Sequence, residues 1–127
     1  MQRMRILAFI VPAVLATAAP AAHIDPISAP ELKSELGADG APMVLDVRTV
    51  REYESGHVPG AVNIPHTELA AHLAKLSAFK EDEIVVYCEV GGRAAAAESV
   101  LEAAGFTGVR TLAGHMRNWR ADGYPRE

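Results

Sequence analysis

Short apolar runs alternate with helical patterns along most of this 127-residue chain. Four runs rich in Val, Ile and Leu have the length of β-strands, and Gly, Pro or Asp residues lie close to their ends. They cover residues 43–47, 61–64, 84–87 and 109–112. Because helical segments lie between consecutive runs, the pattern predicts a parallel sheet with helices on both faces, and therefore an α/β fold.

The segments between the strands carry the periodicity and end signals of helices. The first begins with the capping pattern Ser28-Ala29-Pro30-Glu31, and the third places Leu69, Leu73 and Leu76 at a helical period. The predicted helices cover residues 28–36, 50–54, 67–76 and 93–104, with a last short helix after Gly114.

The first residues form a segment of a different kind. Residues 1–5 are basic, residues 6–16 are apolar but too few to span a bilayer, and small residues follow through Ala22. This is the pattern of a bacterial secretory signal. Ala19-Pro20-Ala21 offers a cleavage site, with Ala16-Thr17-Ala18 as a second.

The chain is therefore expected to consist of a signal peptide, residues 1–21, and a single domain, residues 22–127. We expect an exported, periplasmic protein that is not inserted in a membrane after cleavage, and an uncleaved membrane anchor is the alternative. Its oligomeric state is left open. The chain has 12 Lys and Arg against 16 Asp and Glu, a formal net charge of −4. This acidic balance argues against nucleic acid or anionic lipid as a partner.

Cys88 is the chain's single cysteine, and it follows the apolar run 84–87 directly. In an oxidising compartment it cannot form an internal disulfide, so it is either buried and inert or kept for chemistry with an external partner. Gly91 and Gly92 allow a tight turn before the alanine-rich helix. Backbone N–H groups and the positive end of the helix dipole would converge on this turn and stabilise a thiolate, which indicates a nucleophile.

Two groups of residues resemble the signatures of rhodanese domains. The first group consists of Leu45-Asp46-Val47-Arg48, Glu52-Tyr53 and residues 56–65, and the second of residues 86–93, 103–106 and 112–114 with Trp119. They follow in the expected order and cover nearly all of the chain after the signal. The resemblance implies a central parallel sheet of about five short strands with helices on both faces, and it is closest to small exported bacterial rhodaneses.

The resemblance also implies a rhodanese-type sulfurtransferase. Such an enzyme would move a sulfane sulfur from thiosulfate or a persulfide or polysulfide donor to a thiol or cyanide acceptor, through a persulfide on Cys88. The residues that match the loop cradling the persulfide are Glu89, Val90, Gly91, Gly92 and Arg93. No metal and no organic cofactor is implied.

Two other function classes stay open. One is a rhodanese-like binding or regulatory module without turnover. The other is a phosphatase or thiol-redox role, which is weakened because Arg93 closes a loop one residue shorter than in the related phosphatases and because there is no resolving cysteine.

The chain departs from the family pattern at three positions. Glu89 places a carboxylate beside the thiol, where it would oppose an anionic donor and tend to raise the thiol pKa. Ala94 lacks the hydroxyl that many relatives carry after the loop arginine. His115 stands where a second glycine is usual, and its place after the last strand predicts that it lines the rim of the pocket.

The remaining polar residues are interpreted as structural support. Asp46, Arg48 and Glu52 are expected to form ion pairs and loop hydrogen bonds at the active-site edge, and His57 to stabilise a turn. His66 and His72 cannot share a helix face at their spacing, so the sequence predicts no metal site from them.

Overall fold

The computed structural model describes residues 8, 10–13 and 23–127. The predicted signal peptide lies largely outside these residues, and both of its predicted cleavage sites lie wholly outside them. Within the described residues, no helix combines the length and the apolar character needed to cross a membrane.

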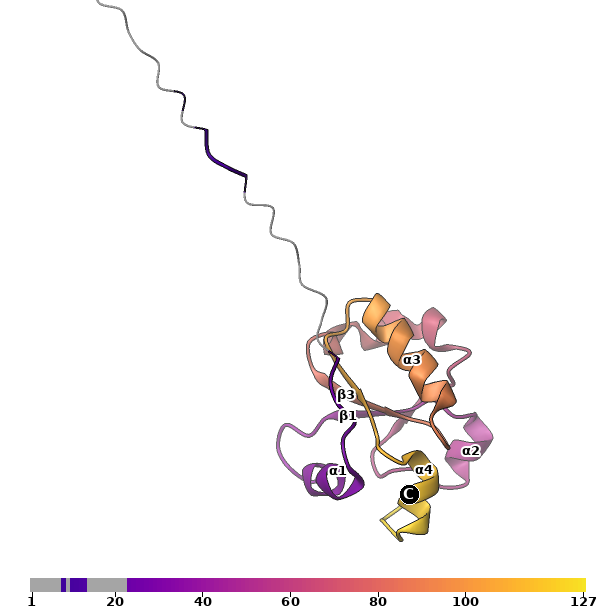
Figure 1. The fold of residues 1–127 in the computed structure, drawn as a ribbon. Coiled ribbons are helices and arrows are strands. Elements are labelled where there is room, and N and C mark those ends of the chain that lie inside the picture. Colours follow the sequence, from indigo (N-terminus) through magenta and orange to yellow (C-terminus); the bar gives the residue numbers. More distant parts are fainter. Residues whose placement is uncertain (1–7, 9, 14–22) are drawn as a thin grey trace, which may run out of the picture.

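Four parallel strands form one sheet in the order β2-β1-β3-β4 (Figure 1). They are β1 (Met43–Asp46), β2 (Val62–Asn63), β3 (Glu83–Tyr87) and β4 (Gly108–Thr111). The predicted α/β class and parallel sheet are confirmed, although the described part of the chain has fewer strands than the five or so predicted.

The fifth position in the sheet is a single bridge rather than a strand. Ile27 pairs with Leu112 beside the end of β4, and its N–H donates to the Thr111 carbonyl at 2.9 Å. On its other side Ile27 accepts the Ala113 N–H at 2.8 Å. Ser28 then caps α1, which begins at Ala29, so the pairing does not continue beyond this bridge in that direction.

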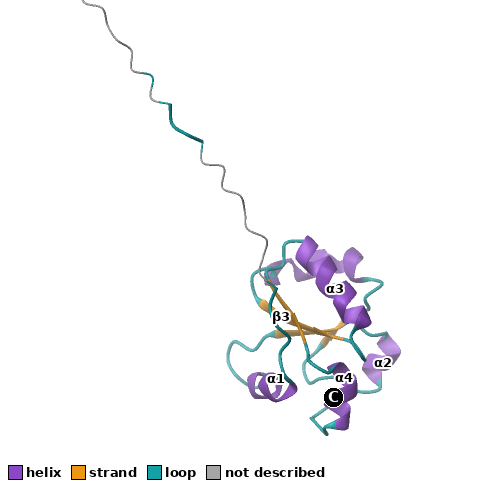
Figure 2. Cartoon of the chain, in the orientation of Figure 1, coloured by secondary structure: helices purple, strands orange, loops and turns teal. Residues whose placement is uncertain are grey.

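Helices cover both faces of the sheet, as Figure 2 shows. They are α1 (Ala29–Glu35), α2 (Val50–Glu54), the 3₁₀ helix η1 (Leu69–Phe79), α3 (Gly92–Ala103) and α4 (His115–Ala121). One face packs against η1 and α3, and the other packs against α1 and α4. The sheet is therefore buried on both sides.

Strand β3 contributes side chains to both faces. Ile84 and Val86 pack under η1 and α3, whereas Val85 and Tyr87 pack against α1 and α4, and all four are fully buried. This alternation explains why the sequence of β3 is continuously apolar. Burial of each aliphatic side chain contributes about 1.5–3 kcal/mol, so the strand that carries Cys88 is firmly held.

The helix predicted over residues 67–76 is a 3₁₀ helix that runs to Phe79. Its first turn shows the winding, because the Ala71 N–H donates to the Glu68 carbonyl three residues earlier, at 3.1 Å. A 3₁₀ helix rises about 2.0 Å per residue against 1.5 Å in an α-helix. η1 belongs to the connection from the edge strand β2 to the central strand β3, and it keeps Leu69 and Leu76 buried.

Candidate active site

Three strand-to-helix connections meet at the carboxyl edge of the sheet (Figure 1). They follow β1, β3 and β4 and lead into α2, α3 and α4. Because these strands are parallel and adjacent in the sheet, their connections lie beside one another. This is the edge at which open α/β sheets bind their ligands.

The sulfur of Cys88 lies inside the turn between β3 and α3. The N–H of Gly91 donates to Sγ at 3.0 Å and that of Ala94 at 3.4 Å. Gly91 makes this turn possible, because its φ of +132° is open mainly to glycine. Two N–H groups at the amino end of a helix therefore point at a residue that is only 1% exposed, an arrangement that favours an anion.

The surroundings of Cys88 lower the pKa of its thiol. Burial raises this pKa, but hydrogen bonding from His115 and from the N–H groups lowers it more, and it falls from 9.0 to about 7. On the order of half of the thiol is therefore thiolate at neutral pH. The net shift is opposite to the rise expected from Glu89, whose carboxylate is paired elsewhere.

His115 is the first residue of α4 and lies against the Cys88 loop. Its Nδ1 accepts a hydrogen bond from the Cys88 N–H at 3.3 Å. The next two N–H groups of α4, those of Met116 and Arg117, donate to the carbonyls of Cys88 and Glu89 at 3.0 and 3.1 Å. The backbone itself therefore holds the start of α4, and with it His115, against the loop.

Arg93 is bound to Glu52 of α2. Its Nη1 and Nη2 donate to the two carboxylate oxygens at 2.6 and 3.0 Å. Glu52 also forms a capping box with Thr49. The hydrogen bond from Arg93 is the main reason that the pKa of Glu52 falls from 4.5 to about 2. The cation predicted at the rim of the loop thus ties α3 to α2.

Glu89 is held by two guanidinium groups. Arg120 donates to its oxygens at 2.7 and 3.2 Å, and Arg48 donates at 3.5 Å. Arg120 is the main cause that lowers the pKa of Glu89. The sequence reasoning missed Arg120, because it belongs to no motif and lies 31 residues away along the chain.

Asp46 and Arg48 form a buried ion pair, with residue exposures of 0% and 1%. Arg48 Nη2 donates to Asp46 Oδ2 at 2.8 Å and to the Gly56 carbonyl at 2.7 Å. The Tyr87 hydroxyl donates to the same Asp46 oxygen at 2.7 Å and accepts the Val58 N–H at 3.1 Å. The network links β1, β3 and the turn after α2. Tyr87 is a member that the sequence analysis did not single out.

His57 lies in the turn after α2. Its Nδ1 donates to the Tyr53 carbonyl at 3.0 Å, and the two rings stack with their centroids 3.7 Å apart. These contacts hold the turn between α2 and β2. They involve no residue of the Cys88 loop.

Among the described residues, one group of three side chains has metal-ligand geometry. Its members are His23, Glu98 and Glu102, whose ligand atoms lie within 4.8 Å of one another. Neither Cys88 nor any other residue of the loop belongs to this group, and His66 and His72 do not belong to it either.

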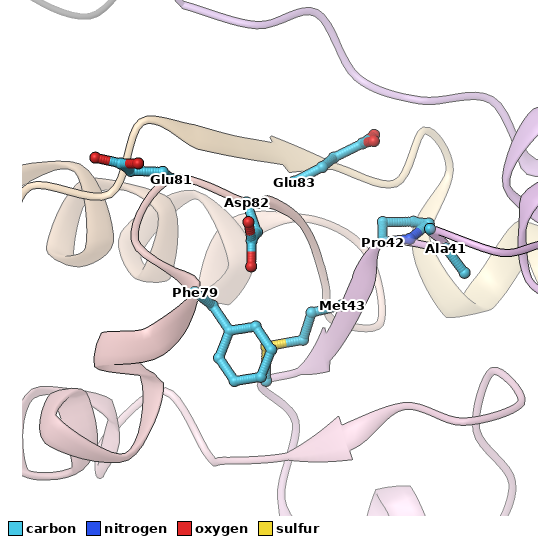
Figure 3. Close-up of a pocket in the computed structure, with 8 residues that line it drawn as sticks. Ala41, Pro42, Met43, Phe79, Glu81, Asp82 and Glu83 are labelled. Carbon is cyan, nitrogen blue, oxygen red and sulfur yellow. The ribbon is translucent and has the colours of Figure 1, made fainter.

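A cavity of about 620 Å³ lies at the opposite edge of the sheet, where β1 and β3 begin. Figure 3 shows Phe79 and Met43 on one side of it and the acidic residues 81–83 on the other. Neither Cys88 nor His115 lines this cavity.

The sequence matches the rhodanese-like domain family over residues 28–122. Human thiosulfate:glutathione sulfurtransferase is 41% identical over 105 residues, which cover 73% of this chain and 90% of that protein. Thiosulfate sulfurtransferase PspE of Escherichia coli is 36% identical over 70 residues, which cover 55% of this chain and 67% of that protein.

Solved structures show the same fold. The rhodanese-related protein of Thermoplasma volcanium superposes with a TM-score of 0.71 at 30% identity, covering 82% of this chain and 98% of that one. Because the family match extends over most of the sequence and the folds agree, this chain belongs to the rhodanese-like domain family, as its motifs predict.

Proposed function

We propose that this chain is a rhodanese-type sulfurtransferase that carries a sulfane sulfur as a persulfide on Cys88. The observation that carries the proposal is the Cys88 thiol, which lies among converging N–H groups and has a pKa lowered to about 7. A thiolate at neutral pH is the nucleophile that this reaction needs. The human relative is named thiosulfate:glutathione sulfurtransferase and the E. coli relative thiosulfate sulfurtransferase, which supports sulfur transfer as the reaction.

In the first half of the reaction the Cys88 thiolate attacks the outer sulfur of the donor. A bond forms between Sγ and that sulfur, the donor's own bond to it breaks, and the electron pair leaves with the rest of the donor. With thiosulfate the leaving group is sulfite, and with a persulfide it is a thiolate. The N–H groups of Gly91 and Ala94, which point at Sγ, stabilise the negative charge in the loop.

In the second half an acceptor thiolate or cyanide attacks the outer sulfur of the persulfide. The S–S bond breaks, its electron pair returns to Cys88 Sγ, and the acceptor leaves as a persulfide or as thiocyanate. Each half exchanges one bond to sulfur for another. No metal or organic cofactor is required, because the thiolate itself supplies the electrons.

The charges around the loop favour a persulfide or polysulfide donor over thiosulfate. Three guanidinium groups surround it, those of Arg48, Arg93 and Arg120, and in the described part of the chain each one is bonded to a carboxylate. A dianion such as thiosulfate would have to compete with these carboxylates for the same cations. A donor with less charge does not meet this competition.

The proposal is tested by steady-state sulfur transfer to cyanide and to a small thiol. Thiosulfate, a polysulfide and a low-molecular-weight persulfide serve as donors, and Cys88→Ser is the control. We expect transfer that depends on Cys88, with a higher kcat/KM for the persulfide or polysulfide. If the folded, reduced protein transfers sulfur from none of the three donors, the proposal fails and the binding-module alternative replaces it.

For the amino-terminal segment, we infer from the sequence pattern that residues 1–21 are removed on export and that the domain works in the periplasm. Amino-terminal sequencing of the protein recovered from a periplasmic extract tests this inference. A first residue at Ala22 supports it, and a chain that retains Met1 in the membrane fraction contradicts it.

A further inference from the structure

His115 has a backbone conformation that normally requires glycine. Its φ is +52°, and it is the one residue other than glycine with a positive φ in the described part of the chain. Gly114 before it also has a positive φ, of +77°. Glycine at 115 would adopt this conformation without strain. Strain that persists at a reactive site points to a role for the side chain.

The imidazole of His115 covers one wall of the Cys88 loop. Its Nδ1 accepts the Cys88 N–H at 3.3 Å. Its Nε2 lies over Gly91, only 3.0 Å from the point where a Cβ on Gly91 would stand. Gly91 is also the residue whose N–H donates to Sγ. The ring therefore lies against the loop at both Cys88 and Gly91, although His115 comes 27 residues after Cys88 in the chain.

These contacts fix where the imidazole carries its proton. Because Nδ1 accepts a hydrogen bond, the neutral ring must carry its hydrogen on Nε2. The free donor of His115 is thus the Nε2–H group, on the side of the ring that faces Gly91. Hydrogen bonding from His115 is also the first of the effects that lower the thiol pKa.

The other charged groups around the loop have partners. The charged residues that face it from the packed elements are Asp46, Arg48, Glu52, Glu89, Arg93 and Arg120. Each is joined to another of the same group, and none of these ion pairs includes His115. Within the described residues, His115 therefore offers the loop a side-chain donor that no carboxylate holds.

We propose that His115 binds the sulfur anion of Cys88 through its Nε2–H, first in the thiolate and then in the persulfide. The persulfide part of this statement rests on the proposed sulfurtransferase function. When an acceptor thiolate takes the outer sulfur, the S–S bond breaks and its electron pair returns to Sγ. The Nε2–H and the loop N–H groups then hold the restored thiolate. His115 thereby supplies the stabilisation that the paired arginines do not.

The test compares His115→Gly and His115→Asn with the wild type and with His72→Gln, a histidine control on η1. Glycine keeps the backbone conformation and removes the donor. Asparagine tolerates a positive φ and restores a donor. The first readout is the rate of Cys88 alkylation against pH, which needs no sulfur donor. The second is the lifetime of the persulfide, measured by intact-protein mass spectrometry.

We expect the midpoint of the alkylation curve to rise by about one pH unit in His115→Gly, so that the rate at pH 6 falls about tenfold. His115→Asn recovers part of this loss, and His72→Gln behaves as wild type. The persulfide of His115→Gly decays faster.

An alkylation curve of His115→Gly that coincides with the wild-type curve overturns the proposal. This holds even if His115→Gly is more stable to unfolding than the wild type. Relief of backbone strain alone would raise the free energy of unfolding but would leave the pH dependence of alkylation unchanged. A wild type that takes up no sulfur overturns the proposed function instead, and the alkylation curves still decide whether His115 binds the thiolate.

Discussion

At the carboxyl edge of the sheet a buried thiol lies among converging N–H groups, whereas a cavity of about 620 Å³ at the amino edge is lined by apolar and acidic side chains. The two edges are built from the same strands, β1 and β3, and differ in the loops attached to them. Of the three acidic residues at the amino edge, Glu81 and Asp82 are exposed and Glu83 is bonded to Arg110 at 3.3 Å. At the carboxyl edge Glu52 and Glu89 are each bonded to an arginine.

The comparison shows that a cavity by itself does not identify the reactive edge of the sheet. The reactive edge is recognised by the N–H groups that point at Cys88 Sγ, by the positive φ of His115, and by the lowered pKa of Cys88. The residues that line the amino-edge cavity include no cysteine, serine, threonine or histidine. Substitutions at the carboxyl edge should therefore change sulfur transfer, stability and Cys88 reactivity more than matched substitutions at the amino edge.

The largest contrast is expected between Cys88→Ser and Glu81→Gln. Loss of the thiol removes the atom that carries sulfur, so sulfur transfer should fall to the uncatalysed background. Glu81→Gln, in the wall of the amino-edge cavity, should keep the wild-type kcat/KM. The rate of thiocyanate release measures both. Substantial transfer by the serine variant would move the chemistry away from the carboxyl edge.

Removing a carboxylate should lower the free energy of unfolding much more at the carboxyl edge, where Asp46 is buried, than at the amino edge, where Asp82 is exposed. Asp46→Ala leaves the guanidinium of Arg48 buried without its partner, and we expect a loss of about 3–5 kcal/mol in the free energy of unfolding. Asp82→Ala removes an exposed carboxylate and should change it by no more than about 0.5 kcal/mol. Urea unfolding measures both, and equal losses would contradict the structural role given to the Asp46–Arg48 pair.

Two glycines with positive φ provide a finer comparison. Gly91→Ala adds a methyl group 3.0 Å from His115 Nε2, whereas Gly40→Ala, at the amino edge, has open space around it. Both changes strain the backbone by about 1–2 kcal/mol. Only Gly91→Ala should also displace the imidazole and slow the alkylation of Cys88. Alkylation that is slowed equally in both variants would show that backbone strain, and not the contact, is responsible.

The smallest effect concerns the pH dependence of the Glu52–Arg93 pair. The folded-state pKa of Glu52 is lowered from 4.5 to about 2. Its contribution to stability should therefore be complete above pH 4.5 and disappear as the pH falls towards 2. Glu52 is about a third exposed, so we expect less than about 1 kcal/mol at pH 7.

The stability of wild type minus that of Glu52→Gln, followed from pH 7 to pH 2, checks this expectation. Glu81→Gln serves as the control at the amino edge. A difference between wild type and Glu52→Gln that persists unchanged at pH 2 would contradict the assignment of the shift to Glu52.

Local sequence signals were enough to predict the strand, loop and helix around Cys88. The run 84–87 is short, β-branched or aromatic throughout, and favours a buried strand, and two glycines and four alanines then define the turn and the helix. The winding of η1 was not predictable in this way. Leu69 and Leu76 are buried in the 3₁₀ helix, but their spacing fits either kind of helix and does not distinguish between them.

The partners of the charged residues could not be predicted from the sequence. Glu52 and Arg93 are 41 residues apart, as are Asp46 and Tyr87. No spacing rule connects such pairs, because only the order of the strands brings them together. The same holds for Arg120, which lies 31 residues from Glu89 along the chain and donates to both of its carboxylate oxygens.

The central claim is that the carboxyl edge holds sulfur on Cys88, and intact-protein mass spectrometry tests it most directly. The reduced domain and its Cys88→Ser variant are exposed to a polysulfide, freed of the donor and weighed before and after addition of cyanide. The account predicts that the wild type gains the mass of one sulfur atom, loses it to cyanide, and that the variant gains nothing. A folded wild type that gains no sulfur, or a serine variant that gains as much, would contradict the account.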